Sequence, residues 1–270
     1  MTVPGPAARL LLPLLLCAAA ACAQTAQERG KRVVMEALAA LGGDKFLTMQ
    51  DRTEKGRAYS FYREEVSGLS QAVIYTQYLA AAGPAGAPAL RERQSFTRNE
   101  KEVSAVLFTD GQGYELTFRG ARPLPLETIG RFNISTFHNV FYLLRMRLNE
   151  PGMLFESKGA DVWLNQPVEI VDIIDADNDV VTVYFHQSSK FPVRQLYYRR
   201  DPKTRRRIEE VTEYGKFREA GGGVYWPLTQ LRTRDGEKVF EMFSESVSVN
   251  QSLSDSLFVL PSGIKILKRL

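Results

Sequence analysis

The chain has 270 residues, with 35 Lys and Arg against 31 Asp and Glu, and its two cysteines are Cys17 and Cys22. The formal net charge of +4 is nearly balanced, so composition gives no general argument for a nucleic-acid partner. Cleavage after Ala23 would leave no cysteine, which excludes disulfides, a thiol nucleophile and thiolate metal sites from the remaining chain.

Residues 1–23 have the pattern of a secretory signal peptide. Arg9 is their only charge, residues 10–21 form an apolar run, and Ala21-Cys22-Ala23 offers small residues for cleavage. The run is shorter than the ~20 residues that a membrane-spanning helix needs. We therefore expect an exported, periplasmic chain in which residues 24–270 form a single domain. A second interpretation stays open: Ala19-Ala20-Ala21-Cys22 is a degenerate lipobox, and lipidation at Cys22 would anchor the protein to a membrane.

A helix is predicted for residues 28–41, because apolar side chains recur there at helical spacing and Gly42-Gly43 follows the last of them. A short continuation over residues 44–49 begins at Asp44, a favourable helix cap. Beyond it the pattern changes to a period of two, which is typical of β-strands. The strands predicted in this part cover residues 59–63, 71–78, 91–97, 103–109 and 114–118, with an Ala/Gly/Pro-rich loop over residues 80–88.

A second helix is predicted for residues 126–148, where one apolar stripe is maintained until Pro151-Gly152 stops it. Every later element is predicted to be a strand joined to the next by a short turn. These strands cover residues 153–155, 168–174, 180–186, 193–200, 206–217, 224–233 and 239–249. The fold class is therefore α+β but mainly β, with one large, strongly curved antiparallel sheet.

Several of these strands are apolar on both faces. Val181, Val183 and Phe185, for example, alternate with Val180 and Tyr184. The two predicted helices cannot cover both faces of so wide a sheet, so one possibility is an apolar cavity that the second helix closes in part. The alternative is that helix and sheet pack solidly without a cavity. The pattern favours neither.

Five segments, in order, give the chain a resemblance to a known superfamily. They are Leu41-Gly42-Gly43 at the end of the first helix, Phe191-Pro192-Val193-Arg194, Tyr225-Trp226-Pro227-Leu228, Val249-Asn250, and Phe258-Val259-Leu260-Pro261-Ser262-Gly263. Together with the central helical insertion, they make residues 28–263 similar in outline to the outer-membrane lipoprotein carrier superfamily.

The resemblance implies a half-open β-barrel with helices as a lid, whose cavity shelters lipid acyl chains. It implies a non-enzymatic periplasmic carrier in outer-membrane lipoprotein sorting or lipid transport, with an acyl lipid or lipoprotein as partner and no cofactor. The carrier itself has one cavity arginine that bonds to the lid, and the candidates here are Arg63, Arg93 and Arg119, all of which are expected on strands. The predicted lipid-binding residues are Ile74, Phe137, Phe141, Leu144, Tyr184 and Met242.

A cationic segment surrounds the turn predicted at Asp201-Pro202. The pattern favours a solvated hairpin tip whose charge discourages edge pairing, with docking on a membrane surface or on an envelope partner protein as the alternative use of its cations. They are Arg199, Arg200, Lys203, Arg205, Arg206 and Arg207. A second class of function also stays open, in which the protein is an envelope scaffold that has the same half-barrel without a ligand and binds its partner through this hairpin or a sheet edge.

No catalytic or metal site can be assembled from the sequence. Asp172, Asp175, Asp177 and Asp179 are spaced as in a calcium loop. That loop, however, requires a glycine at its sixth position and a glutamate at its twelfth, and both are missing. These carboxylates are therefore predicted to stabilise a turn, and we expect no enzymatic activity.

Overall fold

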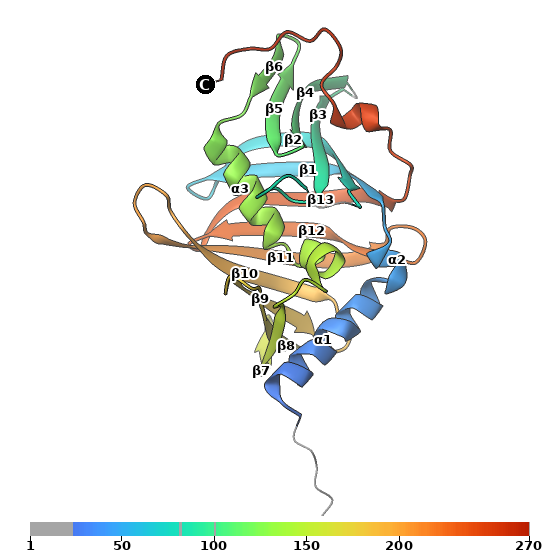
Figure 1. Cartoon of the computed structure of the whole chain (residues 1–270), viewed down its shortest axis with the longest axis vertical. Coiled ribbons are helices and arrows are strands. Elements are labelled where there is room, and N and C mark those ends of the chain that lie inside the picture. The colour runs from blue at the N-terminus through green and yellow to red at the C-terminus, as the bar shows by residue number, and fades with distance from the viewer. Residues whose placement is uncertain (1–23, 81–82, 100, 270) are drawn as a thin grey trace, which may run out of the picture.

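The structure, a computed structural model, describes residues 24–80, 83–99 and 101–269 (Figure 1). The predicted signal peptide and Cys22 lie outside these residues. The strands of the described chain form one antiparallel sheet of 13 strands. They are β1 (Asp51–Tyr62), β2 (Glu65–Tyr78), β3 (Leu90–Arg98), β4 (Lys101–Thr109), β5 (Gln112–Thr117), β6 (Gly120–Pro123), β7 (Leu154–Trp163), β8 (Gln166–Ile174), β9 (Val180–His186), β10 (Pro192–Arg200), β11 (Arg207–Glu219), β12 (Tyr225–Arg234) and β13 (Glu237–Val249).

The sheet consists of two meanders joined through the first and last strands. Its order is β6-β5-β4-β3-β2-β1-β13-β12-β11-β10-β9-β8-β7, so β1 pairs with β13 from Arg52 opposite Val249 to Ser60 opposite Phe240. The sheet is strongly curved, and its edge strands β6 and β7 are not paired with each other in the described chain. This confirms the predicted half-open barrel with helices on one side.

Five helical segments lie on one face of this sheet, which we call the helix face (Figure 1). They are α1 (Ala26–Leu41), α2 (Asp44–Leu47), α3 (Leu126–Phe137), α4 (Val140–Tyr142) and the π-helical turn η1 (Leu143–Arg147). None of the helices in the described residues is long and apolar enough to cross a membrane. On the outer face, the segment with the 3₁₀ turn η2 (Asp255–Phe258) covers β2 to β6, and Phe258 is fully buried there.

The prediction of one helix over residues 126–148 is wrong. The chain leaves α3 at His138, and Asn139 has an extended backbone whose side chain accepts hydrogen bonds from the amides of Phe141 and Tyr142. An asparagine in that role starts a new helix, because it satisfies amides that lack intrahelical partners. The stripe of apolar residues therefore continues across a break in the helix.

Several predicted strands are too short. β1 begins at Asp51 rather than at residue 59, and β7 extends to Trp163 rather than ending at Phe155. The register of β7 shifts between Ser157 and Gly159, and Gly159 has a φ of 96°, so a bulge interrupts its alternation. The short strand β6 was not predicted.

Candidate functional site

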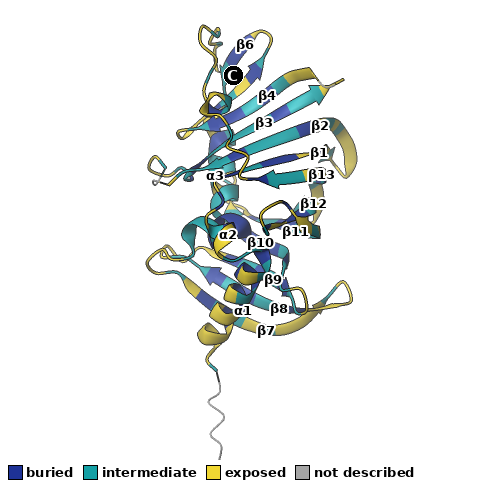
Figure 2. Cartoon of the chain, turned by 90° about the vertical axis from the view of Figure 1, so that its right-hand side faces the viewer, coloured by how far each residue is buried: buried dark blue, intermediate teal, exposed yellow. Residues whose placement is uncertain are grey.

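The helix face of the second meander is filled by helices. Figure 2 shows α1 and α2 set against the lower strands, while β1 to β4 extend above them. Gly30 allows α1 to approach β7, since a Cβ on that glycine would lie 2.8 Å from the Ser157 amide nitrogen. This packed core has fully buried side chains from helices and strands, among them Val34, Leu41, Phe46, Val140, Leu144, Val171 and Val183. The solid packing that the sequence left open as one alternative therefore holds for this half of the molecule.

A separate apolar cluster, which we call the apolar patch, lies on the helix face where the first meander joins β13. Its buried members are Ala58, Ala72 and Met242, from β1, β2 and β13. Ile74, Phe96 and Phe240 pack against them but remain partly exposed to solvent. Helix α3 crosses in front of this part of the sheet in Figure 1.

Helix α3 touches the sheet beside the patch, at its edge. The ring of Phe132 stacks on Phe108 with 3.7 Å between the centroids, and the Asn133 side chain donates to the Gly86 carbonyl at 2.9 Å. The buried Ile129 lies against Gly113 of β5. These contacts hold α3 at the end of β4 and β5 rather than on the patch itself.

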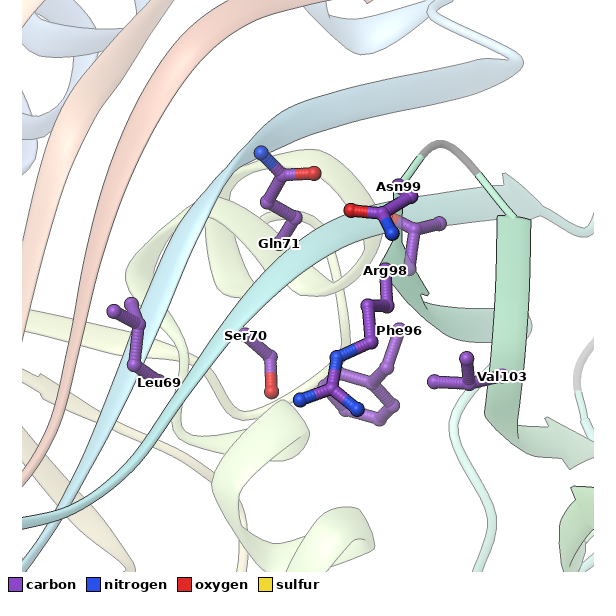
Figure 3. A pocket seen from close by; sticks show the side chains of 8 residues that line it. Leu69, Ser70, Gln71, Phe96, Arg98, Asn99 and Val103 are labelled. Atoms are coloured by element: carbon purple, nitrogen blue, oxygen red, sulfur yellow. The ribbon is translucent and has the colours of Figure 1, made fainter.

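A notch in the sheet opens beside the patch. In chain order, β2 begins to pair with β3 only at Gln71, which lies opposite Thr97. Residues 65–70 of β2 therefore pair with β1 alone. The hairpins β1–β2 and β3–β4 separate beyond this point. The space between them has a volume of about 590 Å³, and Figure 3 shows β2 residues on one side of it and β3 and β4 residues on the other. The notch is lined by Leu69, Ser70, Gln71, Phe96, Thr97, Arg98, Asn99 and Val103.

Phe96 connects the notch with the patch, because its side chain belongs to both. Leu69 and Val103, on opposite walls of the notch, are more than half exposed. An apolar molecule placed in the notch would contact Phe96 of the patch, next to a lining in which five of the eight residues are polar: Ser70, Gln71, Thr97, Arg98 and Asn99.

A buried polar group separates the patch from the packed core. The guanidinium of Arg52 forms an ion pair with Glu54 at 3.3 Å, and the two side chains are 11% and 7% exposed. Arg52 also donates to Thr76 at 2.9 Å and lies 4.2 Å from the centroid of the Trp226 ring. Ser244 of β13 donates to Glu54. Because the ion pair is hydrogen-bonded on both neighbouring strands, it fixes β1 between β2 and β13.

Arg145 connects the helical turn η1 to the residues just before β1. Its Nε donates to the carbonyl of Met49 at 2.9 Å, and its guanidinium lies 4.8 Å from the centroid of Tyr78. Burial raises the pKa of the Tyr78 hydroxyl and lowers the pKa of Arg145. Tyr78 is therefore neutral at physiological pH, and it meets Arg145 as an aromatic ring rather than as an anion.

The three candidates for a cavity arginine lie elsewhere. Arg63 is in the turn between β1 and β2 with a φ of 50°, and Arg119 is in the turn between β5 and β6. Arg93 lies in β3 but faces the outer side, where it donates to the carbonyl of Leu257 and to Glu102. The prediction that all three lie on strands is wrong for Arg63 and Arg119. Arg52 and Arg145, by contrast, contact groups on the helix face.

The structure separates the predicted lipid-binding residues. Ile74 and Met242 belong to the apolar patch, whereas Phe141 and Leu144 are buried in the packed core. Phe137, at the end of α3, lines a space of only about 10 Å³, which has room for about one water molecule.

Tyr184 lies on the outer face. It pairs in register with Arg194 and Ile170, whose neighbours Gln195 and Val171 face the helices. Its ring lies under the Arg194 guanidinium, 4.9 Å from ring centroid to carbon. Tyr184 therefore cannot line a cavity shared with Ile74 and Met242.

The predicted docking cations all lie on or next to the β10–β11 hairpin. Three of them have carboxylate partners: Arg199 bonds to Glu210 at 2.9 Å, Arg206 to Asp235 at 2.7 Å, and Lys203 lies 3.9 Å from Glu127. The other three, Arg200, Arg205 and Arg207, are exposed at the tip.

Of the aspartates with calcium-like spacing, Asp175 stabilises the turn as expected, whereas Asp172 lies in β8 and accepts a hydrogen bond from Thr182. The Asp175 carboxylate accepts hydrogen bonds from the amides of Asp177 and Asp179, both at 3.0 Å, and from Arg147 at 3.1 Å. Among the described residues, no group of three or more His, Cys, Asp or Glu side chains is arranged to hold a metal ion.

The sequence analysis missed Ala58, Ala72, Phe96 and Phe240 of the patch and the neighbouring Arg52. Phe96 lies in a predicted strand, but only the loss of pairing beyond Gln71 shows that it borders a notch. Arg52 and Glu54 stand in a charged stretch that has no apolar alternation, and their spacing of two residues on one strand face was the available signal.

Comparisons with known proteins identify the fold. No family model matches the chain, and no curated protein sequence does. Among solved structures, an outer membrane lipoprotein-sorting protein domain of Vibrio parahaemolyticus matches with a TM-score of 0.55 at 11% identity, covering 86% of this chain and 97% of that chain. A DUF1329 family protein of Desulfovibrio piger matches with a TM-score of 0.56 at 12% identity, over 85% and 97% of the two chains. A LolA superfamily protein of Nitrosomonas europaea gives 0.51 at 11% identity, over 85% and 97%.

Proposed function

We propose that this protein, which has the half-barrel fold of LolA-superfamily and lipoprotein-sorting proteins, is a non-enzymatic carrier for the acyl chains of a lipid or a lipoprotein. The acyl chains lie on the apolar patch, and the notch is the opening through which they reach it. The observation that carries this proposal is the contrast between two parts of one face: helices pack over β7 to β11, whereas Ile74, Phe96 and Phe240, from β2, β3 and β13, stay partly exposed beside a space of about 590 Å³.

The energetics fit such a role. Exposing an acyl chain of about sixteen carbons to water costs roughly 12 kcal/mol, at ~0.8 kcal/mol for each methylene group. A carrier must offset much of this and still release its cargo, and a surface that is only partly enclosed does both. The volume of the notch falls within the roughly 300–1,000 Å³ that is common for small-molecule sites.

The proposal places the carrier in the periplasm, following the signal peptide pattern of residues 1–23. Lipid anchoring through Cys22 would instead hold it at a membrane face. Mass measurement of the exported protein distinguishes the two, because a diacylated N-terminal cysteine adds mass that cleavage after Ala23 does not.

The first test is native mass spectrometry of the processed protein, purified from an exporting host without detergent and then extracted with organic solvent. We expect a bound mass in the lipid range that the solvent removes. A protein that carries no such mass, and gains none when a fluorescent fatty acid is added, would instead be a scaffold with the same fold.

The second test compares two phenylalanines. Phe96→Ser removes the ring shared by patch and notch, whereas Phe118→Ser removes a ring that is 90% exposed at the β5–β6 turn. Losing about 1.5–3 kcal/mol of apolar contact predicts fatty-acid binding that is roughly 10- to 100-fold weaker for Phe96→Ser. Phe118→Ser should bind as the wild type does. Equal affinities for both variants would exclude the notch as the opening.

A further inference from the structure

The tip of the β10–β11 hairpin holds two arginines directly opposite each other. Arg200 and Arg207 pair in register at the ends of the two strands, and both are exposed. Like charges in directly opposed positions of a sheet destabilise the pair. Within the described chain, no carboxylate lies within ion-pair distance of either guanidinium, so their repulsion is not compensated inside the protein.

The acidic residue of this turn, Asp201, is hydrogen-bonded to backbone amides of the turn. The Asp201 carboxylate accepts hydrogen bonds from the amides of Thr204 at 2.7 Å and Lys203 at 3.0 Å, which hold the pKa of Asp201 below its ordinary value. The turn is thereby given a defined shape, and its one ionised carboxylate is outnumbered by the exposed cations around it. Arg205, in a left-handed conformation with a φ of 59°, is exposed on the same turn.

An aromatic ring lies beside these cations. Tyr198 is 44% exposed, and the guanidinium carbon of Arg207 lies 3.5 Å from the centroid of its ring. The phenol donates to Glu209 at 2.9 Å, which orients the ring along the strand. Tyrosine with neighbouring arginine and lysine is the side-chain combination that proteins place at a membrane–water interface.

We propose that this hairpin tip docks the protein on an anionic lipid bilayer. The cations of Arg200, Lys203, Arg205 and Arg207 are distributed over both strands and the turn, so they match an extended array of lipid phosphates better than they match a single anion. Tyr198 adds an interfacial contact. This docking is independent of the cargo, and it gives the carrier a surface with which to approach a membrane.

The test measures binding to vesicles of phosphatidylcholine, with and without about one-third phosphatidylglycerol, by co-sedimentation at low salt. All proteins carry Cys22→Ser, so that no acyl anchor contributes. The wild-type tip should bind the anionic vesicles only, and salt should weaken the binding by screening. Arg200→Gln/Arg207→Gln removes two cations at ~1 kcal/mol each, which predicts a partition coefficient about 30-fold lower.

The matched control is Arg63→Gln/Arg119→Gln. These two arginines are also exposed at turns and also lie over aromatic rings, 5.2 Å from Tyr62 and 5.3 Å from Phe118. The control should bind anionic vesicles within about twofold of the wild type, and thermal unfolding should show that both variants are folded. Equal losses in the two variants, or no loss in the hairpin variant, would overturn the proposal. Tighter binding of the wild type to a polyglutamate peptide than to vesicles would also overturn it, because the tip would then be suited to an acidic protein.

Discussion

At the scale of single residues, Gln195 connects the lid to the sheet. It is a buried glutamine of β10 whose side-chain oxygen accepts from the Val140 amide at 2.7 Å and from the Tyr214 hydroxyl at 2.9 Å. Its side-chain nitrogen donates to the His138 carbonyl at 3.0 Å. It thus satisfies the backbone at the break between α3 and α4. In the sequence, Gln195 stands next to Arg194 in a strand of mixed polar and apolar residues, which gave no signal of this role.

Replacing Gln195 should destabilise the fold strongly. Gln195→Leu keeps much of the volume but leaves the Val140 amide and the His138 carbonyl without partners, at about 1–3 kcal/mol for each buried group. We expect the free energy of unfolding in urea to fall by about 3 kcal/mol. Gln166→Leu, at an exposed position of β8, should change it by less than about 0.5 kcal/mol. A loss below about 1 kcal/mol for Gln195→Leu would mean that water replaces the amide.

At the scale of elements, the sequence predicted most strands but neither the break in the second helix nor the unequal filling of the two halves. The alternation of apolar and polar residues is readable in strands that pair without a shift of register. It fails at the Gly159 bulge, where one extra residue shifts the alternation. The break at Asn139 is invisible to helical periodicity, because the apolar stripe resumes beyond it. Which half is filled depends on where α1 packs on the sheet. Gly30 allows α1 to pack on β7, because the lack of a side chain lets the two backbones approach closely.

Two helical glycines test this role of α1. Gly30→Ala places a Cβ against backbone atoms of β7, 2.7 Å from the Phe155 carbonyl carbon, and should lower the free energy of unfolding by about 1–3 kcal/mol. Gly130→Ala, in α3, meets no atom within 4 Å and should raise it by roughly 0.5–1 kcal/mol, because alanine favours the helix. Chemical denaturation of both variants measures the difference. Equal effects would show that α1 does not depend on this contact.

At the scale of the whole molecule, one curved sheet supports a packed half and an open half. The packed half should resist local opening, since its strands are covered by α1, α2 and η1. The open half presents β2 and β3 with a notch between their ends. Stability within one fold is commonly uneven in this way, with ligand-binding regions at the less stable end.

Hydrogen exchange can measure this asymmetry. We expect the amides of β2 and β3 near Gln71 and Thr97 to exchange faster than those of β8 and β9 around Val171 and Val183. A bound fatty acid should slow exchange in the first pair of strands and leave the second unchanged. Protection of β8 and β9 on binding, with none at β2 and β3, would move the cargo site to the packed half.

The pairing of the first strand with the last has a consequence for biosynthesis. Arg52 lies opposite Val249, so β1 is made long before the strand that covers its second edge exists. Throughout that interval the growing chain exposes an unpaired strand edge, which is a template for association with other chains. Arg52 and Glu54 place two charged side chains on this strand while its edge is still unpaired. In a nascent chain halted before β13, the two meanders would not be hydrogen-bonded to each other. The free edge of β1 is where we expect a holding chaperone to bind.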